Sequence, residues 1–106
     1  MTVIGLTADG KKIVQKIVTG PSSYSSGGFT ETIGELKRID AVQISIRTNL
    51  KTDNYVYVVD YSISGNTITF TVYRIDVTAS SPASWSEVPD GTDISSLTIE
   101  VIAIGF

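Results

Sequence analysis

Aromatic residues with a polar tip are the side chains of this chain best suited to recognising another molecule. Tyr55, Tyr57 and Tyr61 occupy alternate positions, so they share one face if their stretch is a β-strand. Such rings favour protein interfaces and sugar-binding surfaces, because the ring packs while the tip forms hydrogen bonds. The alternative is a sheet face that the chain's own core covers.

Two further aromatic residues stand in loop-like sequence. Tyr24 lies within a stretch rich in Gly, Pro and Ser, and Trp85 lies between Pro82 and Pro89. For both residues, contact with a partner and packing onto the domain itself are open alternatives. Together with one phenylalanine they complete the set of partner-binding candidates, which is Tyr24, Phe29, Tyr55, Tyr57, Tyr61 and Trp85.

The chain contains no His and no Cys, which removes much of the usual chemistry of active sites. Ser-His-Asp and Cys-His catalysis are excluded, as are disulfides and cysteine-type zinc sites. Among the remaining acids, Asp60 and Asp76 stand out because apolar residues flank both. They could form the carboxylate pair of a glycoside hydrolase, or each could face solvent or a cation such as Arg74. We expect the second arrangement, no catalytic residue and no cofactor.

Two loop stretches share only part of a ligand-binding motif. Residues 20–28 are rich in Gly and Ser, but the Lys-Ser/Thr pair and the helix of a phosphate-binding loop do not follow. Asp90 and Asp93 could touch a calcium ion, yet the further acids of a calcium loop are missing. An ordinary loop and an Asp-Gly turn are the expected structures, and we predict no metal site.

The composition predicts a single all-β domain. Ile, Val and Thr supply 38 of the 106 residues, whereas Leu, Ala and Met together supply ten, and β-branched side chains favour strands. This length is usual for one domain, so residues 1–106 are expected to form one. The net charge is −3 and the eight Lys and Arg residues are scattered, so no nucleic-acid partner is expected. No membrane helix or signal peptide is recognisable, so we expect a soluble protein made in a cytoplasm.

The alternation of apolar and polar residues, with intervening turn signals, predicts about seven strands. The expected strands are residues 2–7, 13–19, 29–33, 41–48, 55–63, 67–77 and 97–106. Asp9-Gly10 and Gly65-Asn66 are two-residue hairpin signals. Residues 34–40 could form one helical turn or an open turn. The expected architecture is an antiparallel β-sandwich or a jelly-roll-like barrel.

Several of these strands are apolar on both faces. In residues 55–63 the face that carries the tyrosines lies opposite Val56 and Val58, and residues 67–77 show a similar pattern. A domain this small has a limited interior and can bury only one face of each strand. We therefore expect the remaining apolar faces to contact other subunits of a homo-oligomer.

Two stretches carry a resemblance to known proteins. Residues 24–30 (Tyr-Ser-Ser-Gly-Gly-Phe-Thr), followed by residues 39–42, resemble small all-β structural proteins of tailed phages and prophages. The ending, residues 90–106, does so as well, and its last strand also looks like the close of phage fibre-tip and lectin-like β-domains.

The resemblance implies a virion component that is made in the host cytoplasm. It would be a capsid decoration (cement) protein, or a head or tail component, that acts by packing. Its partners would be copies of itself, for example in a trimer, and the major capsid or tail protein. The alternative is a fibre-tip or lectin-like module that binds a carbohydrate or receptor. The resemblance supplies no catalytic residue.

Overall fold

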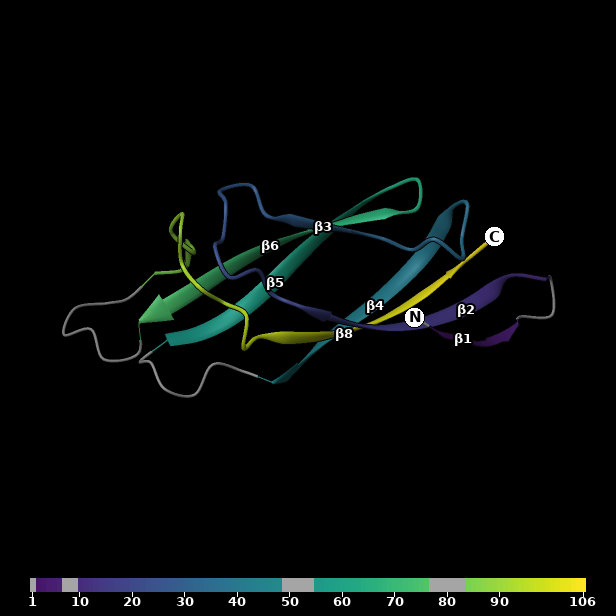
Figure 1. Cartoon of the computed structure of the whole chain (residues 1–106), viewed down its shortest axis with the longest axis horizontal. Coiled ribbons are helices and arrows are strands. Elements are labelled where there is room, and N and C mark those ends of the chain that lie inside the picture. Colours follow the sequence, from purple (N-terminus) through teal and green to yellow (C-terminus); the bar gives the residue numbers. More distant parts are fainter. Residues whose placement is uncertain (1, 7–9, 49–54, 77–83) are drawn as a thin grey trace.

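The computed structural model describes residues 2–6, 10–48, 55–76 and 84–106, and these residues contain strands and loops but no helix (Figure 1). In chain order the strands are β1 (Thr2–Leu6), β2 (Lys12–Thr19), β3 (Phe29–Thr32), β4 (Ile39–Thr48), β5 (Tyr55–Ser64), β6 (Thr67–Asp76), β7 (Ser86–Glu87) and β8 (Thr98–Gly105). The predicted all-β class is confirmed, and each expected strand matches an observed one to within two residues at either end. The two-residue β7 was not predicted.

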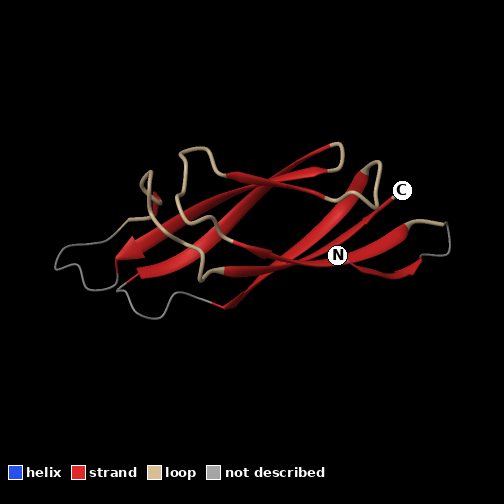
Figure 2. Ribbon diagram, in the orientation of Figure 1, coloured by secondary structure: helices blue, strands red, loops and turns tan. Residues whose placement is uncertain are grey.

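The strands form two antiparallel sheets, as Figure 2 shows. The first has the order β1-β2-β8-β4, and the second has the order β3-β6-β5, with β7 paired to β6 beyond the end of β3. The chain crosses repeatedly between the sheets, which places its last strand, β8, between β2 and β4. The predicted β-sandwich is confirmed. The barrel alternative is not, because no ladder joins the two sheets in the described part of the chain.

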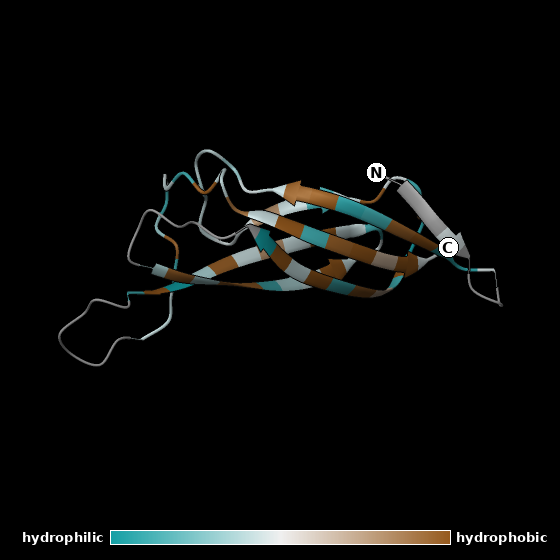
Figure 3. Cartoon of the chain, turned by 90° about the horizontal axis from the view of Figure 1, so that it is seen from below, coloured by the Kyte–Doolittle hydropathy of each residue, from teal (hydrophilic) through white to brown (hydrophobic). Residues whose placement is uncertain are grey.

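Alternation along the two central strands builds the core. Ile68, Phe70 and Val72 on β6 and Ile99 and Val101 on β8 have no solvent-exposed surface. In Figure 3 brown and teal segments alternate along the strands, as expected for sheets with one buried face. The β-branched residues on one face of these two strands therefore fill part of the space between the sheets.

Short turns connect the strands where the sequence predicts them. The Gly65-Asn66 pair links β5 to β6 as a hairpin, and Gly65 has a φ of 61°, which suits the left-handed region that glycine tolerates. Ile33 to Leu36 form a hydrogen-bonded turn, in which the Leu36 N–H donates to the Ile33 carbonyl oxygen, and residues 34–38 contain no helix. The helical alternative for this stretch is therefore wrong. At the other hairpin signal, Gly10 also has a positive φ, whereas Asp9 lies outside the described residues.

Candidate functional site

Tyr24, a predicted partner contact, lies in the core of the domain. Only 1% of its surface is exposed, and its hydroxyl accepts a hydrogen bond from the Val72 N–H (3.2 Å) and donates to Glu87 (2.7 Å). The hydroxyl fills the gap between β3 and β7 along the edge of β6. Burial is the main reason why the pKa of Tyr24 rises to about 12. Packing onto the domain, rather than exposure to a partner, is therefore the role the structure gives this residue.

Glu87 fastens the loop that contains Tyr24. Besides the tyrosine hydroxyl, its carboxylate accepts hydrogen bonds from the Gly27 N–H (2.8 Å) and the Ser26 hydroxyl (3.2 Å). These donors, led by the tyrosine hydroxyl, lower the pKa of Glu87. The Ser- and Gly-rich loop is thus held by an internal carboxylate and has the ordinary structural role that the sequence favours.

The strand that carries three tyrosines presents them in three different environments. Tyr57 is 3% exposed and belongs to the core. The ring of Tyr55 lies beneath the Arg74 guanidinium, whose central carbon is 3.8 Å from the ring centroid. Tyr61 is 39% exposed and its hydroxyl lies 3.5 Å from the Val42 carbonyl oxygen on β4. The three tyrosines share one face of the strand as predicted, but Tyr61 is the one of the three with an exposed ring.

The two remaining aromatic candidates also differ. Phe29 is partly buried, packs against the core and places its ring centroid 5.3 Å from that of Phe70. Trp85 is 49% exposed and stands beside β7. Of the six predicted partner-binding residues, Tyr61 and Trp85 are the two that the structure leaves open to a partner.

The acids singled out in the sequence are not brought together. Asp60 and Asp76 lie about five residues apart along the β5–β6 ladder and on opposite faces of the sheet, a separation of roughly 17 Å along the strands. Asp90 accepts a hydrogen bond from the Ser26 N–H, and Asp93 accepts from the N–H and hydroxyl of Ser95. Both therefore organise turns, and the described residues contain no cluster of three potential metal ligands.

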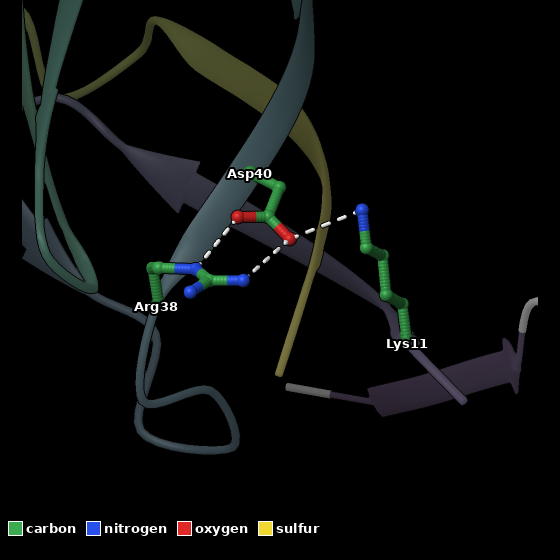
Figure 4. A network of polar contacts seen from close by, with 3 residues as sticks. All are labelled: Lys11, Arg38 and Asp40. Carbon is green, nitrogen blue, oxygen red and sulfur yellow. Dashed lines mark hydrogen bonds and ion pairs between the residues drawn. The ribbon is translucent and has the colours of Figure 1, made fainter. Parts of the chain in front are cut away.

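One end of the sandwich carries a polar cluster that the sequence did not reveal (Figure 4). Asp40 accepts a hydrogen bond from Arg38 (2.8 Å) and pairs with Lys11 (3.2 Å), and the pKa of Asp40 falls, chiefly because of Arg38. The Arg38 guanidinium and the Lys11 ammonium also lie over the Phe106 ring, at 4.9 and 5.6 Å from its centroid. These contacts join residues of this chain to one another, so the cluster stabilises the place where the start of β4 meets the end of β8.

The two lateral sides of the sandwich differ. On one side, Lys16 of β2 and Glu31 of β3 form an ion pair that joins the two sheets. On the opposite side, where β4 and β5 lie next to each other, an open apolar groove of about 230 Å³ separates the sheets. The groove is lined by Ile44, Ser45, Ile46, Val58, Val59 and Ile99. We regard this groove, with the two strand edges beside it, as the candidate functional site.

The groove is an uncovered part of the core. Ile99, at its base, is 0% exposed, Ile44, Ile46 and Val59 are partly buried, and Val58 at its rim is 41% exposed. Next to the groove, the Tyr61 side chain spans from β5 to β4, where its hydroxyl lies near the carbonyl oxygen of Val42. An apolar surface between two strand edges suits an apolar or extended protein segment rather than a charged small molecule.

Comparison with known proteins finds no matching family model, no similar curated protein and no similar solved structure. Within the described residues, no helix has the length and apolar character that crossing a membrane requires.

Sequence reasoning missed the groove because strand order creates it. The residues that line it come from β4, β5 and β8, and nothing local in the sequence indicates that β4 and β5 end up as neighbouring edges. The available signal was the pair of apolar faces on residues 55–63, which correctly marked β5 as a strand with more apolar surface than the core uses.

Proposed function

We propose that this protein is a structural β-sandwich that works by packing against other protein chains. The observation that carries the proposal is the apolar groove between β4 and β5 and the exposed apolar residues of β5 beside it. Exposed apolar surface next to strand edges marks sites of protein contact. The more specific setting follows from the sequence resemblance: a capsid decoration protein, or a head or tail component, of a tailed-phage particle.

The properties of the site support packing as the mode of action. Four of the seven exposed large hydrophobic residues in the described chain lie on β5, namely Val56, Val58, Tyr61 and Ile63. Their burial in a contact would remove apolar surface from water, which is the main driving force of protein association. The role needs no cofactor and no reactive group.

Cosedimentation tests the proposed role. The purified chain is mixed with purified heads and tails of tailed phages from its host, and the pelleted fraction is measured together with the native mass of the free chain. Saturable binding at a fixed ratio to the major capsid or tail subunits is the expected result. A chain that stays in the supernatant with every particle fraction would overturn the virion role.

A carbohydrate- or receptor-binding module is the second candidate, and Trp85 is the observation that favours it. Trp85 is the most exposed of the large hydrophobic residues in the described part of the chain, at 49%, and aromatic rings of this kind stack on sugars. It is also the only Trp of the chain, so glycan titrations can be followed by its fluorescence. Saturable quenching that disappears in Trp85→Ala would favour this role, and an unchanged spectrum across a glycan panel would remove it.

A further inference from the structure

The two sheets end in four lateral edges, and three of them are protected against pairing with another chain. β1 has five residues and an irregular register between Val3 and Gly5. β4 has irregular registers at both of its ends. The third edge is divided between the short strands β3 and β7, with the Tyr24 hydroxyl between them. Short strands, bulges and side-chain plugs are the devices that keep natural sheets from joining edge to edge.

β5 is the exception. It has ten residues in unbroken register with β6, from the Tyr55–Asp76 pair to the Ser64–Thr67 pair, and contains no Pro, Gly or Lys. Asp60 is its only charged residue. A long, regular and apolar edge of this kind is a template for another strand. Among the described edges, β5 is therefore the one built to accept a partner strand.

The hydrogen-bonding groups at this edge can be assigned from the ladder. The Val72 N–H donates to the Tyr24 hydroxyl, and the Val72 carbonyl oxygen accepts from the Val88 N–H, so both groups point away from β5. Val59 lies opposite Val72 in the ladder, so its N–H and C=O point away from β6, toward the open edge. The alternation of an antiparallel ladder then directs the backbone of Tyr61 and Ile63 to the same open edge. The Tyr61 N–H accordingly donates to its neighbour, the Asp60 side chain, at 2.9 Å.

We infer that β5 pairs with β5 of a second copy of this chain, antiparallel and centred on Tyr61, which joins the two second sheets into one. This inference rests on the proposed packing function and names the surface and partner that it uses. In this register Val59 faces Ile63 of the second copy, and Asp60 faces Ser62, whose hydroxyl can donate to the carboxylate. Apolar residues thus oppose apolar ones, and the acid gains a donor.

The neighbouring registers match less well. Centring on Asp60 sets two carboxylates directly opposite each other, which destabilises a strand pair. Centring on Val59 places Asp60 opposite Val58 and gives the carboxylate no donor. In the Tyr61-centred pair, the Tyr61 N–H passes from Asp60 to the backbone carbonyl of the second copy. Ile63, which is 37% exposed, is buried beside Val59 at the rim of the partner's groove.

A cysteine scan tests the register directly, because the chain has no native Cys. Opposite residues of an antiparallel pair have Cα atoms about 5 Å apart, within disulfide range. Tyr61→Cys, which lies on the twofold axis, is expected to give a disulfide-linked dimer under mild oxidation. Val59→Cys and Asp60→Cys report the two alternative registers, and Thr69→Cys on β6 is the control for random collision. Crosslinking at position 59 or 60 in preference to 61 would overturn the register.

A matched pair of charge substitutions tests the surface. Ile63→Lys places a cation at the β5 edge, and Ile17→Lys makes the same change at an exposed Ile (42%) on the other sheet. Ile63→Lys should weaken self-association at least about tenfold by sedimentation equilibrium, because two buried cations lack partners, while Ile17→Lys should not. Equal effects, or none, would overturn the inference, and circular dichroism verifies that both variants fold.

The outcomes separate this inference from the proposed function. A chain that still binds phage particles, but is monomeric or dimerises through a surface other than β5, overturns the β5 pairing and leaves the packing role intact. A chain that crosslinks through Tyr61→Cys but binds no particle keeps the β5 pairing and overturns the virion role.

Discussion

A single hydroxyl group on Tyr24 compensates for a gap in backbone pairing. Val72 has no exposed surface, and its N–H lies between β3 and β7, where the Tyr24 hydroxyl is its acceptor. Tyr24→Phe would keep the ring and leave this buried N–H without a partner, a loss of about 1–3 kcal/mol in the free energy of unfolding. Urea denaturation followed by the fluorescence of the single Trp measures the change.

Tyr61→Phe is the matched control at the residue scale. It also removes one tyrosine hydroxyl, but from a ring that is 39% exposed and whose hydroxyl lies 3.5 Å from a carbonyl. Its effect should stay within about 0.5 kcal/mol. Equal stability losses in the two variants would show that the Tyr24 hydroxyl does not fill the gap along β6.

At the scale of elements, close approach of two strand ends explains one glycine. A Cβ on Gly105, the last residue of β8, would collide with the backbone carbonyl of Arg38 just before β4. Gly105→Ala must therefore push apart the strand ends that the Phe106–Arg38 hydrogen bonds join, at a cost of about 1–3 kcal/mol in thermal or chemical unfolding. Gly34→Ala is the control, because a Cβ there meets nothing within 4 Å. Comparable losses at both positions would contradict the steric account.

The strands could be predicted because each one carries its own alternation. Ile99 and Val101 of β8 are buried and Glu100 between them is half-buried, as the pattern of the last strand indicates. The order of the strands could not be predicted in this way, since the placement of β8 between β2 and β4 depends on contacts between residues distant in the sequence. The groove and the Lys16–Glu31 pair both result from that order, so they could not be predicted. The choice between the two open roles of Tyr24 could not be made for a related reason, because its acceptor role depends on the gap between β3 and β7.

At the scale of the whole molecule, charge and titration predict a broad pH range of constant stability. The chain has no His, so no side chain has an ordinary pKa between about 5 and 8. The pKa values of Asp40, Glu87 and Asp93 are lowered in the fold, by Arg38, by the Tyr24 hydroxyl and by Ser95, respectively. Their contribution is therefore complete above the ordinary carboxyl pKa and is lost as the pH falls through the lowered values.

At alkaline pH the stability changes in the opposite direction, and the buried Tyr24 contributes to this change. Burial raises the pKa of Tyr24 from 10.0 to about 12, so the folded state keeps a proton that the unfolded state releases above pH 10. The contribution of Tyr24 to stability is thus complete below pH 10 and is lost as the pH rises toward 12. We expect the unfolding temperature to be level from about pH 5 to 9 and to fall on both sides. In Tyr24→Phe the alkaline fall should become shallower while the acid limb keeps its direction. A transition centred between pH 6 and 8, or an alkaline limb unchanged in Tyr24→Phe, would contradict this assignment.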